Sequence, residues 1–327
     1  MKFLVTGGTG FCGYNIVEGL LEQNYKPRVL VYEKNGNIKG LVQKKLELIS
    51  GDLLKPETLI PGTKDIDIII HAAGVEGGFG VTLNQLQVHV KGTQNLLEAA
   101  KKNNLKRFIF ISSTGVAMGR ANYAADEKTI PKPKTAYDRA KYEGEKVVKE
   151  FCEREKIEYI IIRPSSIYGP YEMKHKAKLF QLIQKQKFFI VGNGRNLKSF
   201  VYTENLKQGI LLALTKEKAI NNTYIISDKR PYEMNEFINT IARQLKVRTP
   251  MHIPKSIAWV GAMILEAIVS ITKKEPLLSR GRINTLTSSP IFSIEKARKE
   301  LGYEPKFDLE EGIAKTIAWY RENGVLR

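Results

Sequence analysis

Two residues four positions apart could carry acid-base chemistry. Tyr137 and Lys141 lie in the stretch TAYDRAKYEGE, and this spacing places both side chains on one face of a helix. A phenol has a pKa of about 10, too high for ready proton exchange at neutral pH, and neighbouring positive charge would lower it. Tyr137 could then act as a general base toward an alcohol or as a general acid toward a carbonyl group.

The same spacing occurs a second time, because Tyr142 and Lys146 repeat it five residues later. Five residues turn a helix by about 140° beyond a full revolution, so only one pair can face a given ligand. We favour Tyr137 because the upstream stretch FISSTGVAMG ends a strand-like run in hydroxyl residues. Thr114 in that stretch could hydrogen-bond a reacting oxygen. Turn chemistry is the alternative for Thr114 and for the two serines before it.

A glycine-rich stretch near the start of the chain could bind phosphate. In TGGTGFCG, residues 6–13, the glycines fit both the GxGxxG and the GxxGxxG pattern between a strand-like and a helix-like run. Glycine allows a tight turn and close approach of the backbone to a pyrophosphate, which then lies against the free N–H groups of the helix N-terminus. The alternative is a glycine-rich turn without a ligand. The members of the pattern are Gly7, Gly8, Gly10 and Gly13.

Two acidic residues follow later strand-like runs and suit the rest of a dinucleotide. Glu33 comes twenty residues after Gly13, directly behind the run PRVLVY, where a carboxylate can accept hydrogen bonds from an adenosine ribose. Asp52 follows the third run and could meet the adenine. A turn or a helix N-cap is the alternative for Asp52.

The elements that must position these residues alternate along the first half of the chain. Apolar runs typical of buried strands lie at 2–6, 27–32, 46–50, 67–72, 107–112, 158–164 and 222–227, and helix-like runs lie at 11–23, 84–103 and 135–156. Strands alternating with helices predict an α/β fold with a doubly wound parallel sheet. After Pro164 the alternation loosens, which predicts a smaller lobe over the carboxyl edge of the sheet. We expect a dinucleotide-binding domain at 1–167 and a substrate lobe at 168–327, with about 198–230 returning to the first domain.

Composition narrows the class of protein. The chain has 327 residues with 43% hydrophobic content and a formal net charge of +18. The basic residues are spread in short clusters, so a solvated basic surface is favoured over an anionic membrane surface or a nucleic acid. Cys12 and Cys152 form no CxxC or Cys/His cluster, so neither a disulfide framework nor a metal site is expected. No secretory signal pattern precedes the first strand-like run. We expect a cytoplasmic protein that binds no nucleic acid.

Five motifs in their order and spacing resemble those of the extended short-chain dehydrogenases/reductases, within the NAD-dependent epimerase/dehydratase superfamily. They are TGGTGFCG, HAAG (71–74), SSTGVAMG (112–119), YDRAK (137–141) and RPSSIYGP (163–170), and the likeness extends to the tail at 293–320. The resemblance implies a Rossmann fold that binds NAD or NADP. It also implies a catalytic triad of Thr114, Tyr137 and Lys141, with Lys141 holding the nicotinamide ribose.

The resemblance implies a set of cofactor-binding residues along the carboxyl edge of the sheet. His71 would line the phosphate side together with the three residues after it. NAD is favoured over NADP because Glu33 would repel a 2′-phosphate, although Lys34 weakens this preference. Relatives often dimerise through the helix that bears YxxxK, so we expect a homodimer. The expected cofactor-binding residues are Gly7, Gly10, Phe11, Gly13, Glu33, Asp52, Leu53, Ala72, Ala73, Gly74, Tyr137, Lys141, Pro164 and Ile167.

The implied chemistry is hydride transfer between a nicotinamide and a secondary alcohol or ketone, used once by a dehydrogenase or reversed by an epimerase or dehydratase. Members that act on nucleotide sugars usually carry RxxN and Arg-Asp-Phe where this chain has Ser166 and Lys198-Ser199-Phe200. The segment 189–214 looks more like 3β-hydroxysteroid, sterol-4-carboxylate and dihydroflavonol dehydrogenases or reductases. We therefore expect a sterol-, terpenoid- or flavonoid-like substrate. The alternative is a nucleotide sugar whose diphosphate is clamped by Arg280 and Arg282.

The run SIAWVGAMILEAIVSI at 256–271 is almost wholly apolar. At sixteen residues with Glu266 inside, it is too short for a membrane-spanning helix. A buried helix or pocket lid, a peripheral membrane contact and an oligomer contact are three explanations, because an apolar helix must be covered somewhere. A regulatory protein without turnover is disfavoured, because cofactor binding alone does not require Tyr137.

Overall fold

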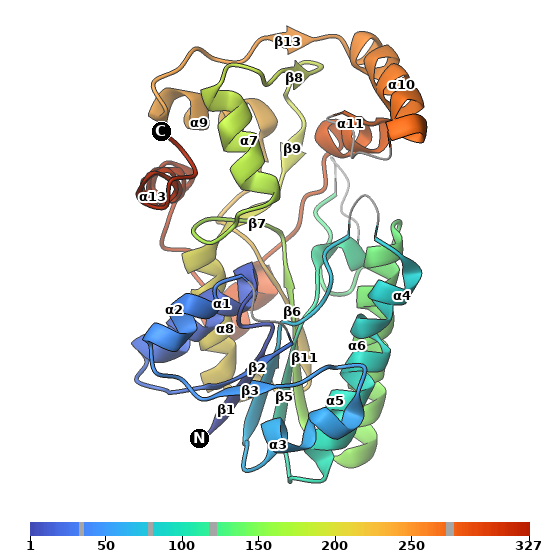
Figure 1. Ribbon diagram of the computed structural model, residues 1–327, viewed down its shortest axis with the longest axis vertical. Helices are drawn as coiled ribbons and strands as arrows, with labels where there is room; N and C mark the ends of the chain where they lie inside the picture. The colour runs from blue at the N-terminus through green and yellow to red at the C-terminus, as the bar shows by residue number, and fades with distance from the viewer. Residues whose placement is uncertain (33–35, 78–80, 118–122, 273–277) are drawn as a thin grey trace.

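Seven parallel strands form the sheet of the N-terminal lobe (Figure 1). The computed structural model describes residues 1–32, 36–77, 81–117, 123–272 and 278–327. The strand order reverses between β1 and β4, which opens the crevice where sheets of this kind bind ligands. The predicted doubly wound α/β sheet is therefore confirmed. From one edge the order is β3 (Leu48–Ser50), β2 (Arg28–Val31), β1 (Phe3–Thr6), β4 (Ile68–His71), β5 (Arg107–Ile111), β6 (Glu158–Pro164) and β11 (Asn222–Ile226).

The central strands are continuous apolar runs because helices cover both faces of the sheet. All four residues of β1 and of β4 are buried, as are six of the seven residues of β6. A strand with one face in water would alternate apolar and polar residues instead. Each of the seven strands begins and ends within two residues of the range expected from the sequence.

Helices cover the two faces in separate groups. On one face, α1 (Phe11–Glu22), α8 (Thr203–Thr215) and α12 (Glu295–Leu301) share a core with β1 and β11. On the other, α5 (Lys91–Lys101) and α6 (Ala136–Glu155) share a core with β4 and β5. Shorter helical segments of this lobe are α2 (Ile38–Gln43), Pro56–Thr58, α3 (Ile60–Thr63), Thr114–Val116 and Glu217–Ala219.

The helix expected at 84–103 is wrong as a single element. It is divided into α4 (Leu83–Leu86), a 3-10 turn at Gln87–His89 and α5. The break directs the ring of His89 under the loop that follows β4, where Nε2–H donates to the carbonyl oxygen of Val75 at 2.8 Å. The side chain of His89 is thereby held by a segment outside the helix.

The second lobe lies over the carboxyl edge of the sheet (Figure 1). Its aromatic core includes Phe200 and Phe237, whose rings stack at 4.1 Å, with the ring of Tyr168 edge-on to both. Three strand pairs join its segments, while α8 and β11 belong to the first lobe. The pairs are β7 (Ser166–Tyr168) with β10 (Phe200–Tyr202), β9 (Leu197–Lys198) with β12 (Tyr232–Glu233), and β8 (Ile190–Val191) with β13 (His252–Ile253). The helices are α7 (His175–Gln184), α9 (Met234–Gln244), α10 (Lys255–Thr272), α11 (Arg280–Thr287) and α13 (Leu309–Glu322).

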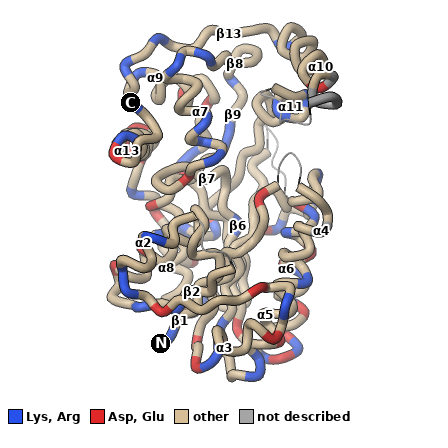
Figure 2. The backbone as a smooth tube through the Cα atoms, in the orientation of Figure 1, with Lys and Arg blue, Asp and Glu red and all other residues tan. Residues whose placement is uncertain are grey.

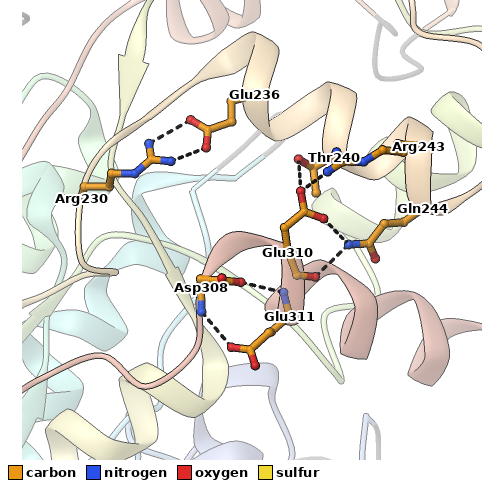
Figure 3. A network of polar contacts seen from close by, with 8 residues as sticks. All are labelled: Arg230, Glu236, Thr240, Arg243, Gln244, Asp308, Glu310 and Glu311. Carbon is orange, nitrogen blue, oxygen red and sulfur yellow. Dashed lines mark hydrogen bonds and ion pairs between the residues drawn. The ribbon is translucent and has the colours of Figure 1, made fainter.

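A polar network fastens α13 to α9 (Figure 3). Glu310 accepts hydrogen bonds from Gln244 Nε2 at 2.9 Å and from Thr240 Oγ1 at 3.3 Å, and pairs with Arg243. Asp308 caps the start of α13 by accepting from the backbone N–H of Glu311 at 2.9 Å. Exposed pairs of this kind add little free energy, so the network fixes the register of the two helices more than it stabilises them.

Candidate active site

A cleft of about 720 Å³ follows the carboxyl edge of the sheet and continues to α7 of the second lobe. Its wall brings together residues that are far apart in the sequence. Glu33 lies outside the described residues, and the predicted residues Gly8, His71 and Thr114 do not line the cleft. The predicted residues on the wall are Gly7, Gly10, Phe11, Gly13, Asp52, Leu53, Ala72, Ala73, Gly74, Tyr137, Lys141, Pro164 and Ile167.

The glycine-rich loop makes a cradle that side chains would fill. Gly7 has a φ of +72°, and a Cβ atom added to it would lie 2.6 Å from the backbone nitrogen of Ala73. A Cβ on Gly13 would lie 2.1 Å from the carbonyl oxygen of Gly7. Helix α1 begins after Gly10 without a side-chain cap, so the first N–H groups of the helix face the loop without a competing carboxylate. This arrangement fits the pyrophosphate of a dinucleotide.

Asp52 and Leu53 line the far end of the cleft, together with Tyr32. One carboxylate oxygen of Asp52 accepts from the backbone N–H of Leu54 at 2.9 Å, so Asp52 also stabilises its own turn. The turn role given as the alternative for Asp52 is therefore confirmed, and its contact with an adenine stays a prediction. Because Glu33 lies outside the described residues, the structure adds nothing to the preference for NAD.

His71 is buried behind the wall, which corrects the expectation that it lines the phosphate side. Thr93 donates its hydroxyl hydrogen to the carbonyl oxygen of His89 at 2.8 Å, so Nε2–H of His71 must donate to Thr93 Oγ1 at 3.0 Å. Nδ1 of His71 then accepts from Thr6 Oγ1 at 2.6 Å. Burial holds the pKa of His71 well below its usual 6.5, so the ring is neutral and joins the ends of β1 and β4 to α5.

Tyr137 and Lys141 reach the cleft from the first two turns of α6. Thr135 caps this helix by accepting from the N–H of Asp138 at 3.0 Å, which fixes where the first turn starts. Lys141 Nζ donates to the carbonyl oxygen of Ile111 at 2.8 Å and lies 6.0 Å from the centre of the Tyr137 ring. Burial lowers the pKa of Lys141 from 10.5 to about 8.

The second tyrosine and lysine pair lies elsewhere on α6. Among the residues that the structure describes, Tyr142 and Lys146 are not on the wall of the cleft. Lys146 Nζ lies 5.0 Å from the centre of the Tyr142 ring and 2.8 Å from a carboxylate oxygen of Glu143. Helical geometry thus separates the two copies of the pattern as expected.

The pKa of Tyr137 is raised in the chain without a cofactor. Burial raises it above 10, and the negative charges of Glu76 and Asp138 raise it further. The expected decrease, which needs a cationic nicotinamide as well as the Lys141 ammonium group, stays a prediction. Positive charge from a bound group would be required to bring the phenol toward neutral pH.

The three hydroxyl residues after β5 have different surroundings. Ser112 donates to Glu145 at 2.5 Å, and Glu145 forms a buried ion pair with Arg163 at 2.6 Å, so Ser112 is structural. Ser113 lines the cleft, and its Oγ accepts from the N–H of Gly115 at 3.1 Å. Thr114 is 5% exposed and donates to the carbonyl oxygen of Pro164 at 3.2 Å, directly behind the wall.

Several cleft residues could not be identified from the sequence. His89 is 1% exposed, its Nδ1 has no hydrogen-bond partner, and its ring meets Tyr137 edge-on at 5.5 Å. Glu76 lies 3.5 Å from Lys174 Nζ and 3.6 Å from His175 Nε2, and so connects the two lobes across the cleft. No local motif marks these residues, because they meet only through the tertiary fold.

Lys176 lies on the wall of the cleft, and Lys198 is close enough to it to interact electrostatically. Lys176 lines the cleft and donates to Ser166 Oγ at 3.0 Å. Burial, with the nearby positive charge of Lys176, lowers the pKa of Lys198 to about 7. Arg280, in contrast, is held by Glu266 at 2.7 Å, so the expected clamp of Arg280 and Arg282 does not have a free Arg280.

Comparison with known proteins gives matches over most of the chain. Residues 3–227 match the NAD dependent epimerase/dehydratase family. The chain is 30% identical over 336 residues to a 3 beta-hydroxysteroid dehydrogenase/Delta 5→4-isomerase of Mycobacterium tuberculosis, covering 98% of this chain and 90% of the relative. It is 28% identical over 331 residues to a putative UDP-glucose 4-epimerase of Methanocaldococcus jannaschii, covering 98% of each. The fold also matches UDP-glucuronic acid 4-epimerase from Bacillus cereus in complex with NAD, with a TM-score of 0.79, 23% identity and 99% coverage of both chains.

Proposed function

Because this chain belongs to the NAD dependent epimerase/dehydratase family, we propose that it is an NAD(P)-dependent oxidoreductase that acts on a secondary alcohol or its ketone. The observation that carries the proposal is that Tyr137 and Lys141 share one cleft with the glycine cradle. A bound nicotinamide would accept or supply the hydride, and the residues of the chain would bind, orient and exchange the proton.

The cofactor would be held along the carboxyl edge of the sheet. The N–H groups at the start of α1, behind Gly10, would bind the pyrophosphate. Lys141 Nζ donates one hydrogen bond to the carbonyl oxygen of Ile111, which leaves its other N–H groups for ribose hydroxyls. With a pKa of about 8, Lys141 is mostly charged at neutral pH. The preference for NAD over NADP is part of this proposal and rests on Glu33.

Tyr137 would exchange a proton with the substrate oxygen. In the oxidation of an alcohol the phenolate accepts the hydroxyl proton, and in the reduction of a ketone the phenol donates it. Thr114 would hold the same oxygen after its hydroxyl turns from Pro164 toward the cleft, which requires rotation of one side-chain bond. Together the two hydroxyls would fix the reacting carbon in the cleft.

We propose an apolar, ring-bearing substrate of sterol, terpenoid or flavonoid-like size. Ser166 and the sequence Lys198-Ser199-Phe200 stand where nucleotide-sugar enzymes of the family usually have other residues. The similarity to the 3 beta-hydroxysteroid dehydrogenase/Delta 5→4-isomerase of Mycobacterium tuberculosis supports the same class. Burying about 200 Å² of apolar ligand surface would contribute about 5 kcal/mol before the costs of association.

A nucleotide-sugar epimerase or dehydratase is the second candidate. Lys176 and Lys198 support it, because no ion pair to an acidic side chain is found for either among the described residues. Lys176 on the cleft wall, with Lys198 near it, could pair with a diphosphate or another anionic group, whose negative charge would favour the protonated form of both lysines. The putative UDP-glucose 4-epimerase relative supports it as well.

Purified protein tests the two candidates directly. It should be incubated with NAD or NADP and with steroid alcohols, terpenoid alcohols or UDP-sugars, and followed at the absorbance of the reduced nicotinamide. We expect turnover with an apolar alcohol. Epimerisation of a UDP-sugar by chromatography, with no reduced cofactor released and no turnover of apolar alcohols, would favour the second candidate instead.

A further inference from the structure

Helix α10 (Lys255–Thr272) turns two alanines and part of Trp259 inward and five large apolar residues outward. Ala258 and Ala262 are 2% and 0% exposed and pack against Val191 of β8 and Ile283 of α11. An ordinary surface helix has the reverse arrangement, with its largest apolar side chains in the core. Of the explanations given for 256–271, burial of the helix within this chain does not account for these exposed residues.

The outward residues form one band on the helix. At about 100° per residue they lie within about 140° around the axis, opposite the two alanines. Their exposed fractions lie between 48% and 62%, although each side chain is large and apolar. We call this set the α10 band: Ile257, Val260, Met263, Ile264 and Ile268.

Two more exposed apolar residues lie beside the strand pair that adjoins α10. Phe189, just before β8, is 42% exposed, and Met251, just before β13, is 70% exposed. Since β8 pairs with β13 and β13 leads directly into α10, these residues and the α10 band lie at the same end of the second lobe (Figure 1).

The segments that build this end are basic and contain no acidic residue. Residues 177–197, which leave out the lysines of the cleft, include three Lys, one Arg and no Asp or Glu, and residues 244–265 include two Lys, one Arg and no Asp or Glu. Figure 2 shows Lys and Arg along these segments around β8 and β13, while α10 is nearly free of charge. The one carboxylate of α10, Glu266, is neutralised by Arg280 at 2.7 Å.

We propose that this end of the second lobe binds peripherally to the surface of a membrane that contains anionic lipids. The α10 band, with Phe189 and Met251, would enter the boundary between headgroups and acyl chains, and the surrounding cations would contact anionic headgroups. None of the described helices has the length and apolar character needed to span a bilayer, so the contact is with one leaflet. The proposal goes beyond the proposed reaction and does not depend on it.

Charge favours a membrane over a second copy of this chain. A symmetric dimer through this end would bring two sets of Lys and Arg together with no acidic residue from 177–197 or 244–265 to balance them. A nucleic acid would satisfy the cations but would leave the α10 band in water. An anionic bilayer provides both an apolar interior and negative charge.

Sedimentation of the full chain with vesicles tests the proposal. We expect at least about tenfold stronger binding to phosphatidylcholine mixed with phosphatidylglycerol than to phosphatidylcholine alone, and weaker binding as salt is raised. The double variant Ile257→Asp/Ile264→Asp should lose about tenfold or more of this binding. Val42→Asp is the matched control, because Val42 is 59% exposed on α2 of the other lobe.

A second pair of variants separates charge from apolar contact. Lys187→Gln/Lys255→Gln should weaken binding to the anionic vesicles, whereas the exposed Lys26→Gln in the first lobe should not. Unfolding midpoints confirm that each variant is folded. Absence of vesicle binding, or equal binding by the α10 double variant, overturns the proposal. Light scattering that shows a wild-type dimer abolished by Ile264→Asp, without vesicle binding, would assign the surface to a second copy.

Discussion

A Cβ atom on Gly13 would lie 2.1 Å from the carbonyl oxygen of Gly7, whereas a Cβ on Gly10 would lie 3.3 Å from the same atom. Gly13→Ala should therefore force the first turn of α1 away from the loop and lower the free energy of unfolding by about 1 to 3 kcal/mol. Gly10→Ala should leave unfolding nearly unchanged, because Gly10 has a φ of −84° that alanine adopts readily. Urea denaturation without cofactor measures both. If Gly13→Ala and Gly10→Ala lose the same free energy of unfolding, the loop relaxes around a methyl group at either position.

The same pair of variants also tests the phosphate cradle. Because the N–H groups behind Gly10 would meet a pyrophosphate, a methyl group on Gly10 should weaken NAD binding by about tenfold even though the fold is intact. Calorimetric titration with NAD measures this affinity. Unchanged binding by Gly10→Ala would place the pyrophosphate elsewhere.

Tyr137→Phe should lower kcat by about 10²-fold or more and leave the dissociation constant of the cofactor nearly unchanged, because only the proton exchange is lost. Tyr142→Phe is the matched control on the same helix, and it should retain full turnover. Steady-state kinetics on whichever substrate the screen identifies provides the measurement. Near-normal turnover by Tyr137→Phe would overturn the assignment.

We expect Ser113 to be a capping residue and Thr114 to supply the catalytic hydroxyl, so their variants should differ. Ser113 Oγ accepts from Gly115 N–H at 3.1 Å, so Ser113→Ala should cost about 1 kcal/mol of stability with a small effect on kcat. Thr114→Val should lower kcat by at least about tenfold, and Thr114→Ser should restore it, since only the hydroxyl is needed. The opposite pattern, with kcat lost in Ser113→Ala, would give the catalytic role to the hydroxyl that lines the cleft.

Local sequence patterns were sufficient for the sheet and for part of the cleft. The strands are runs of β-branched and aromatic residues such as IIIH in β4. Because both faces of these strands are buried, their positions can be read from the local sequence. The glycine loop and the Tyr137–Lys141 spacing are also local, because each depends on residues within one turn or two. Such features are readable before the fold is known.

Features that depend on distant segments were not predictable. His89 reaches the cleft only because the helix breaks before Lys91, and Glu76 meets His175 only because the lobes face each other. The direction in which the pKa of Tyr137 shifts also depends on burial and on the charge of Glu76. Neither can be derived from the spacing of residues in the sequence. In α10 the composition showed an apolar helix, but the choice of alanines for the inner face is set by the packing of β8 and α11.

Lys141 should make stability rise with pH in an alkaline window. Burial lowers its pKa from 10.5 in the unfolded chain to about 8, so between those values the unfolded chain binds a proton that the folded chain has released. The free energy of unfolding then increases with pH across this window, by at most about 3 kcal/mol, as the cost of burying the charge is removed. Cys12 stays protonated over most of the window, because burial raises its pKa to about 12.

The difference in unfolding free energy between wild type and Lys141→Met isolates this contribution, because titrations shared by both proteins cancel. We expect the free energy of unfolding of wild type to rise relative to that of the variant as the pH is raised from about 8 to 10.5. This interval is set by the two pKa values of Lys141. Lys26→Met, at an exposed position, should show a constant difference from wild type over the same range. A flat or falling difference for Lys141→Met would mean that the ammonium group stays charged in the folded chain, stabilised by Ile111 and by the carboxylate of Glu145.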